Sequence, residues 1–370
     1  MTASLIYFPG KGQFLSPEEG RKAAESVLAT PLEQRRERCV ELHLEDPEQL
    51  LCVSTLLWRL GEIEPARAFR EAEFFYSFIE VPRRPIGVFD ERDYYLGEFA
   101  LIAGGVARIL SKRADAKRWF DLAESHFVLA HNASAHIARL AYQRLALTLE
   151  ERDFESVIQR TPRWVEAFTR LDLPEDALKC RFLEATALKE TGRLQDAKHG
   201  FHGIKQEAAQ KRFERLEAMA SENLFQMHAF LGEVAEAVAE AGQASTILAR
   251  LNNRVSLAKL QLGVGYLMRS QGNLPESVKA FRNAQHQFSE IEMHADVAAT
   301  HLVLADLLLD ASQPAQAEWE IRAALPIVDS LKLVPEGIAA LSLLRDSLRR
   351  RQIDRQALRS LNGYFEELGS

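Results

Sequence analysis

The chain contains few of the residues that cross-link a fold or interrupt helices. Its 370 residues include 3 cysteines, 13 prolines and 19 glycines. Cys39, Cys52 and Cys180 have no paired spacing, so we expect small core side chains in a reducing compartment rather than a disulfide framework. The low proline and glycine content, with 47% hydrophobic residues, suits a rod built from helices.

Long apolar runs and an excess of positive charge are also missing. No run of 18 apolar residues occurs, and the apolar segment Leu5–Phe8 is too short for a signal-peptide core. We therefore predict no membrane-spanning helix and a cytoplasmic protein. The net charge of −7 argues against direct nucleic-acid binding, because phosphate contacts need a basic surface.

The sequence offers no recognisable catalytic or metal-binding spacing. It has no Gly-x4-Gly-Lys-Ser/Thr loop for phosphate, no His-Glu-x-x-His zinc motif and no Gly-x-Ser-x-Gly nucleophile turn. His126, His131 and His136 are five residues apart, which does not keep them on one helical face. We therefore predict a non-enzymatic protein without catalytic residues, cofactor or metal.

A period of 40 residues organises most of the chain. We take the loop residue between two helices as a marker, and the last five intervals between markers are all 40 residues. A fixed period of this length indicates an array of one repeated supersecondary unit. The markers are Gly61, Ser111, Arg152, Gly192, Gly232, Gly272, Ser312 and Gln352.

Positions around the marker carry side chains of recurring size. Seven residues before it, small residues such as Gly104 and Gly265 recur, and nine residues after it, Phe120 and Phe281 recur. Small and large columns of this kind let neighbouring helices interlock. Five residues after the marker, the column is mostly alanine or serine and predicts close backbone approach: Ala66, Ala116, Val157, Ala197, Ala237, Ser277, Ala317 and Ala357.

The units around Gly192 and Gly272 resemble the tetratricopeptide repeat. That family has a glycine after the first helix, then alanine, an aromatic residue and alanine in the second; here Ala197 and Phe201 match the first two, and Ile204 stands at the place of the second alanine. The resemblance covers roughly residues 47 to 368, with units of 40 residues instead of the usual 34. It implies an all-α fold, a right-handed superhelical solenoid of about eight helix-turn-helix hairpins.

We predict a short N-terminal helical cap before the array. Residues 1–45 are assigned to a tail and capping helices, and residues 46–370 to the solenoid, because Ser16-Pro17, Thr30-Pro31 and Asp46-Pro47 each favour a helix start. Residues 81–92 form an insertion whose prolines and glycine predict a loop. It is either a neutral surface loop or a partner-contacting arm with Arg83, Arg84 and Phe89.

The resemblance also implies where a partner binds. In tetratricopeptide families the first helices line a concave groove, and their ligand-contacting positions transfer here to a mixture of aromatic, basic and amide side chains. Aromatic residues anchor a ligand, basic residues hold carboxylates, and amides bind a peptide backbone. The predicted groove residues are Arg139, Tyr142, Lys179, Phe182, Lys189, Asn223, Gln226, Lys259, Tyr266 and Arg269, with Gln143, Thr186 and Asp306 beside them.

These features favour a module that binds another protein or a peptide as an adaptor, scaffold or regulatory sensor. A peptide-responsive transcription regulator or regulatory-factor inhibitor, similar to the bacterial repeat sensors, is the alternative. Residues 17–44 are too short for a full DNA-binding domain, and Arg35, Arg36 and Arg38 are offset by nearby glutamates. An enzyme with its site in the 81–92 loop or the N-terminal region is the third reading, disfavoured by the missing motifs.

Overall fold

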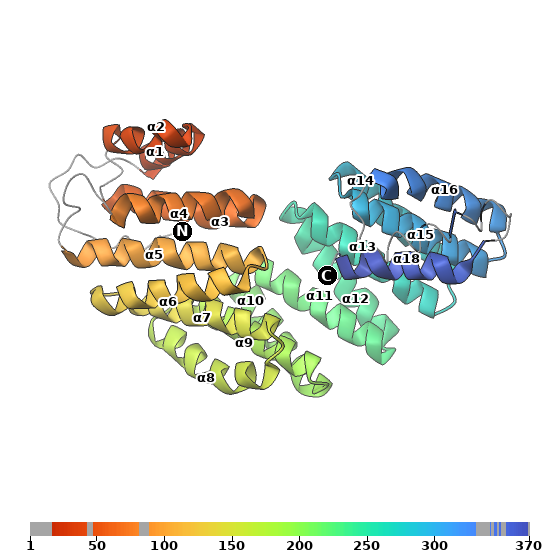
Figure 1. Ribbon diagram of the computed structural model, residues 1–370. Helices are drawn as coiled ribbons and strands as arrows, with labels where there is room; N and C mark the ends of the chain where they lie inside the picture. Colours follow the sequence, from red (N-terminus) through yellow and green to blue (C-terminus); the bar gives the residue numbers. More distant parts are fainter. Residues whose placement is uncertain are drawn as a thin grey trace. The chain divides into compact units, whose positions relative to one another are not determined.

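The computed structural model describes residues 17–42, 47–80, 89–330, 341, 344, 345, 348 and 353–368. All regular structure in these ranges is helical, and the helices follow one another as antiparallel neighbours (Figure 1). The predicted all-α solenoid of helix hairpins is therefore confirmed. The marker Gln352 lies outside the described residues.

Most helices of the array have 16 to 18 residues, as a 40-residue hairpin requires. Their bounds are α1 Pro17–Ala29, α2 Leu32–Glu41, α3 Pro47–Ile63, α4 Pro65–Glu80, α5 Phe89–Ile109, α6 Arg113–Leu129, α7 Ser134–Glu150, α8 Phe154–Arg170, α9 Pro174–Glu190, α10 Leu194–Lys211, α11 Glu214–Leu231, α12 Val234–Arg250, α13 Arg254–Ser270, α14 Leu274–Glu290, α15 His294–Asp310, α16 Pro314–Ser330 and α18 Arg355–Leu368.

The chain divides into two compact units, residues 1–187 and residues 188–370, with the boundary inside α9. We call them the N-terminal unit and the C-terminal unit and describe each by itself. In each unit, consecutive helices pack against each other, as α5 does with α6 and α13 with α14. In the C-terminal unit, the last helix α18 lies alongside α15 (Figure 1).

Both turns of the repeat use a left-handed residue. The markers from Ser111 to Ser312 have φ between 57° and 78°, and the following N–H closes the helix end, as from Arg193 to the Leu188 carbonyl at 2.9 Å. Gly61 differs, because it lies inside α3 and the first hairpin breaks at Glu64. A second left-handed series, also 40 residues apart, ends the second helices: Asn132, Asp172, Arg212, Asn252 and Glu292.

In two hairpins, a glycine of the first helix leaves space for a phenylalanine ring of the second helix. A Cβ built on Gly104 would lie 2.5 Å from Cδ1 of Phe120, and one on Gly265 would lie 2.6 Å from Cδ1 of Phe281. Neither glycine can carry a side chain without displacing its phenylalanine. The prediction that small and large columns interlock is confirmed at these two hairpins.

The residue seven before the marker and the residue nine after it vary in opposite directions in size. Where the first helix carries a large residue, Leu145 or Phe225, the second carries the smaller Thr161 or Ala241, and all four are buried. The column five residues after the marker is also buried as predicted, from Ala116 to Ala357. Ala66 is the exception and is exposed, because the first hairpin breaks at Glu64 and Ala68 takes the buried position.

The two short helices predicted before the array are present as α1 and α2. Val27 and Cys39 are fully buried in one core with Leu50 of α3. Arg35, considered above as a DNA-contacting residue, is instead buried, donates to the Thr30 carbonyl at 3.0 Å and pairs with Glu71. Cys39 and Cys180 are buried, and Cys52 is half-buried.

The insertion is shorter than predicted. The helix α5 begins at Phe89, so residues 89–92 belong to a helix, because nothing after Gly87 opposes one. The rest of the insertion, with Arg83 and Arg84, lies outside the described residues. Among the helices that are described, none combines the length and low polarity needed to cross a membrane.

We predict opposite effects for two glycine-to-alanine substitutions on neighbouring helices. Gly265→Ala forces Phe281 to move and should lower the free energy of unfolding by about 1–3 kcal/mol. Gly242→Ala, inside α12, adds a Cβ into open space and should raise it by about 0.5–1 kcal/mol through helix propensity. Urea unfolding of the full chain measures both, and equal effects of the two changes would contradict the interlocking contact.

Candidate functional site

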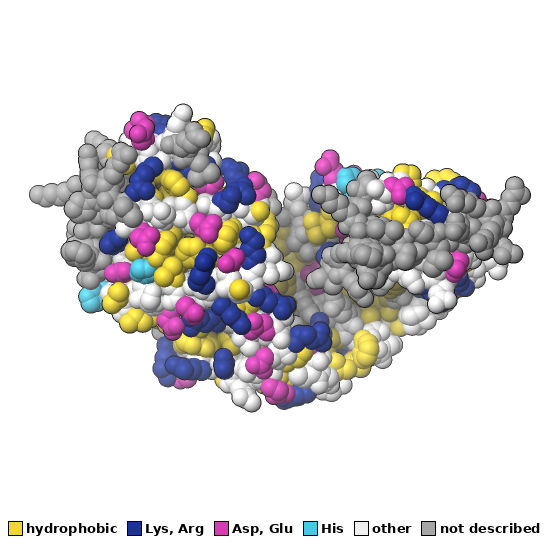
Figure 2. Space-filling model, viewed as in Figure 1, with side chains coloured by type: hydrophobic (Ala, Val, Ile, Leu, Met, Phe, Trp, Pro, Cys, Tyr) yellow, Lys and Arg dark blue, Asp and Glu magenta, His cyan; other side chains and the backbone are white. Residues whose placement is uncertain are grey.

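The predicted groove residues fall on the first helices α7, α9, α11 and α13. Arg139, Tyr142, Lys179 and Phe182 belong to the N-terminal unit. The other six belong to the C-terminal unit. Each group is therefore described separately. On the face seen in Figure 2, basic and acidic side chains are interspersed with apolar ones.

In the N-terminal unit, the predicted basic residues are neutralised by acids of the chain itself. Arg139 Nε lies 3.5 Å from Asp176 Oδ2, and Lys179 Nζ lies 3.4 Å from Asp176 Oδ1 and 2.9 Å from Glu175 Oε1. Burial acts to lower the pKa of Lys179, but the two carboxylates outweigh it and raise this pKa. A carboxylate ligand at these residues would have to compete with Asp176.

The predicted aromatic residues of this unit serve the core. Tyr142 packs against two apolar clusters, with Leu145 and Leu183 in one and Phe168 in the other. Burial raises the pKa of its hydroxyl. Phe182 is likewise half-buried. The N-terminal group thus supplies neither an unpaired charge nor a largely exposed ring.

In the C-terminal unit, the structure brings three predicted residues together. Lys189 Nζ donates to Asn223 Oδ1 at 3.0 Å and to Gln226 Oε1 at 3.5 Å, which joins α9 to α11. Asn223 Nδ2 donates to the Met219 carbonyl at 3.0 Å. Burial lowers the pKa of Lys189 against the opposing charge of Glu190, and the side chains to which Lys189 donates are neutral amides. This cluster is therefore positively charged and polar.

An exposed aromatic ring completes this face and was missed at the sequence level. Phe230 is 79% exposed and lies four residues after Gln226 on α11, so both point to the same side of the helix. The spacing of four residues between Gln226 and Phe230 is visible in the sequence. The ligand-contacting positions of the tetratricopeptide family end one residue before Phe230.

Lys259 lies among acids of the same unit. Burial raises the pKa of Glu222 to about 7, and the nearby charge of Lys259 opposes this rise. Burial also raises the pKa of Asp296, again against the effect of Lys259. Lys259 itself is exposed. The face of α11, α13 and α15 thus holds two half-buried carboxylates whose ionisation is costly.

The remaining predicted residues, Tyr266 and Arg269, are held by the fold. The ring of Tyr266 packs edge-on against Phe281, with centroids 5.1 Å apart. Arg269 Nη2 lies 2.6 Å from Asp306 Oδ2 and 2.5 Å from Asp310 Oδ2. Arg269, predicted to hold a carboxylate of a ligand, is therefore paired with two carboxylates of the chain itself.

Two further arginines join this network and were not predicted. Arg355 Nε lies 2.6 Å from Asp306 Oδ1 and pairs also with Asp310, and Arg359 Nε lies 3.3 Å from Asp306. Burial acts to raise the pKa of Asp306, but hydrogen bonds from Arg269 and Arg355 outweigh it and hold this pKa below its usual range. Both arginines lie on α18, which the family positions do not cover.

Two histidine networks in the N-terminal unit have the appearance of proton relays. Tyr76 Oη lies 3.0 Å from Nε2 of His126, whose Nδ1 lies 2.7 Å from Asp93 Oδ1. Burial, followed by the charge of Glu80, raises the pKa of Tyr76 to about 12, so its hydroxyl stays protonated and is a poor nucleophile. We interpret this relay as structural.

The second histidine network is buried more deeply. His136 Nε2 lies 3.2 Å from Glu98 Oε2, and the Trp58 indole donates to Glu98 Oε1 at 3.1 Å. Burial acts to raise the pKa of Glu98, and His136 outweighs it, so this pKa is lowered. Across the described ranges, no group of three or more His, Cys, Asp or Glu side chains is arranged to hold a metal.

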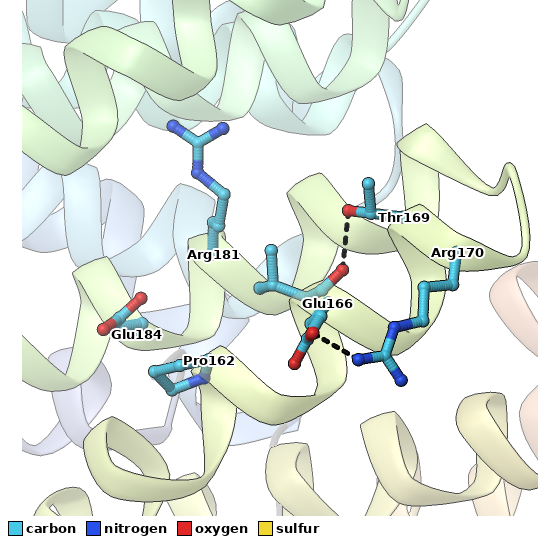
Figure 3. Close-up of a pocket in the computed structure, with 7 residues that line it drawn as sticks. Pro162, Glu166, Thr169, Arg170, Arg181 and Glu184 are labelled. Atoms are coloured by element: carbon cyan, nitrogen blue, oxygen red, sulfur yellow. Dashed lines mark hydrogen bonds and ion pairs between the residues drawn. The ribbon is translucent and has the colours of Figure 1, made fainter.

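Two hollows of the surface are lined by residues other than the predicted groove residues. One of about 510 Å³ is formed by α8 and α9, where Glu166 pairs with Arg170 and Thr169 donates to the Val165 carbonyl at 2.8 Å (Figure 3). Pro162, inside α8, lines it as well. A second, of about 470 Å³, is formed by α12, α13 and α14. Neither of these two hollows includes a predicted groove residue.

Several solved structures are similar to this chain. The apo form of RapI has a TM-score of 0.57 and 15% identity, over 95% of this chain and 98% of that one. The Rap conjugation gene regulator of plasmid pLS20, in complex with the Phr* peptide, has a TM-score of 0.55 and 14% identity, over 96% and 97%. Aspartyl phosphate phosphatase F from Bacillus subtilis has a TM-score of 0.51 and 11% identity, over 88% and 99%.

These likenesses show the fold alone, because all three identities are below 25%. They show a helical repeat fold along nearly the whole chain. No family model matches the chain, and no curated protein matches its sequence.

We predict that Glu222 makes the stability of the protein depend on pH. Its pKa of about 7 in the folded chain exceeds the ordinary 4.5, so the folded state binds more protons between these values. Stability therefore falls as pH rises through this window. Glu222→Gln should flatten the fall in melting temperature between about pH 5 and 7.5 and raise the value at the upper end. Glu236→Gln, at an exposed position on α12, is the control, and an equal effect of both changes would refute the assignment.

Proposed function

We propose that the chain is a non-enzymatic, peptide-responsive regulatory module of the long tetratricopeptide type. Its ligand, a peptide or a segment of another protein, binds the face that α11 forms with the end of α9 in the C-terminal unit. The cluster of Lys189, Asn223 and Gln226 beside the exposed ring of Phe230 is the observation that carries this proposal. The solved neighbour in complex with the Phr* peptide supports the same ligand class.

Each group of this cluster has a role in the proposal. Beside their contacts with Lys189 and the Met219 carbonyl, the amides of Asn223 and Gln226 each keep an N–H donor and an oxygen lone pair, which match the alternating N–H and C=O groups of a peptide backbone. Phe230 offers a rigid apolar surface, because an aromatic ring covers a large area with little rotamer entropy to lose. Lys189 supplies the positive charge, and two neutral amides compensate its burial only partly.

Regulation is the consequence that we attach to binding. A ligand that spans helices of successive hairpins favours one spacing of those hairpins over another, and this differential contact shifts the conformational equilibrium. One solved neighbour is described as a conjugation gene regulator, which supports this role. In the proposal, residues 1–45 form the cap and residues 46–370 the sensing solenoid.

An enzymatic role is the weaker candidate. A solved neighbour is described as an aspartyl phosphate phosphatase, and that description belongs to the neighbour. In this chain, the buried carboxylates Glu98 and Glu320 and the relay of Asp93 are engaged with histidines and other side chains of the fold.

The test compares two faces of the C-terminal unit. Peptides selected from a random library on the full chain should bind the double variant Asn223→Ala/Gln226→Ala at least about tenfold more weakly, because each lost hydrogen bond costs about 1 kcal/mol. Gln243→Ala, at an exposed position of α12, should bind as the wild type does. Isothermal titration measures the affinities, and circular dichroism confirms that both variants keep their helix content. Equal affinity of both variants would exclude this face.

A further inference from the structure

We propose that Arg269, Arg355 and Arg359 form an oxyanion-binding site that takes a carboxylate or phosphate group at the edge of the α13–α15 face. The site joins three helices of the C-terminal unit, α13, α15 and α18. It rests on the proposed function only for the source of the anion, since an acidic or phosphorylated group of the ligand would supply it.

The convergence of the three guanidinium groups is the first observation. All three contact the one carboxylate of Asp306, at 2.6 Å from Arg269, 2.6 Å from Arg355 and 3.3 Å from Arg359. Asp310 receives a second contact from Arg269 and Arg355. Three positive charges therefore meet two negative charges, and a third anionic group would balance the cluster.

Unused donors are the second observation. A guanidinium has five N–H donors, and among the described residues Arg359 contacts Asp306 through Nε alone. Its side chain is 60% exposed, so four of its donors remain accessible to a ligand. Two parallel N–H groups of an arginine match two oxygens of a carboxylate or phosphate.

Preorganisation is the third observation. Asp306 is nearly buried and fixes the inner edges of the guanidinium groups, so a ligand would not have to order three flexible side chains. Arg355 is the first residue of α18. The neighbouring acid Asp354 caps this helix start by accepting the N–H groups of Gln356 and Ala357 at 3.0 Å, so the positive potential of the site comes from the arginines.

The experiment titrates the full chain with inorganic phosphate and, separately, with succinate, at an ionic strength held constant with sodium chloride. Melting temperature and isothermal titration are the readouts. Both anions should raise the melting temperature of the wild type in a saturable way, because a ligand that binds only the folded state stabilises it. Arg359→Gln should weaken this binding at least about fivefold, since it removes a bidentate donor.

Arg322→Gln is the matched control. Arg322 is as exposed as Arg359, at 60%, and it pairs with Glu318 on α16, away from Asp306. Its removal should leave anion binding within about twofold of wild type, which separates a local site from the general charge of the surface. Arg359→Lys keeps the charge but loses the planar fork, so it should bind more weakly than wild type.

The outcomes are distinct. Tighter binding of succinate indicates a carboxylate ligand and tighter binding of phosphate a phosphorylated one, and either supports the site. A rise that does not saturate, or equal binding by wild type and Arg359→Gln, overturns it and leaves the cluster as a structural link of α18. Neither probe requires Asn223 or Gln226, so failure here and failure of peptide binding are separable.

Discussion

The close crossing of the two helices in each hairpin is the contact on which the rest of the structure depends. At Gly104 and Gly265 a phenylalanine of the second helix occupies the space of a side chain on the first. Where the first helix carries Leu145 or Phe225 instead, the second is small at the facing column. Because interiors are close-packed, the summed volume at the crossing has to stay nearly constant, whichever helix supplies it. This constraint keeps the hairpins similar enough to stack, and stacking leaves one face of each first helix available.

On this face of the first helices, the two units differ in how far the charged side chains are neutralised by other side chains of the chain. In the N-terminal unit, Asp176 accepts both Arg139 and Lys179, and the aromatic Tyr142 contributes to the core. In the C-terminal unit, Lys189 is held by neutral amides, and Glu222 is desolvated with Lys259 as its opposing charge. Polar and charged side chains that the fold neutralises only partly gain most from a ligand, because the ligand can supply a further hydrogen bond or ion pair. This difference, more than the position in the repeat, is the reason for proposing a binding face in the C-terminal unit.

The likeness to Rap proteins shows the fold of this chain, and the binding chemistry has to be argued from the side chains of the chain itself. At identities of 11% to 15%, the shared helical repeats reflect the same packing solution along almost the full length. Repeat solenoids change their ligand by changing a few exposed side chains while the crossing residues persist. The proposed peptide site and the arginine cluster are therefore argued from contacts made here. Arg355 and Arg359 illustrate the point, because their role follows from the docking of α18 on α15 and from no position of the repeat.

The sequence by itself determined the helical class, the 40-residue hairpin and the buried small column, because helix periodicity and turn positions are local properties that a single unit displays. It also placed Lys189, Asn223 and Gln226 on the first helices, and the structure joins these three side chains by hydrogen bonds. Only the tertiary structure decided which of the candidate charges remain available. The sequence shows only that Arg139, Lys179 and Arg269 are basic. In the structure, carboxylates from other turns and other helices neutralise them. The partner of a charge is set by contacts between segments as far apart as α15 and α18, and such contacts leave no periodic signal.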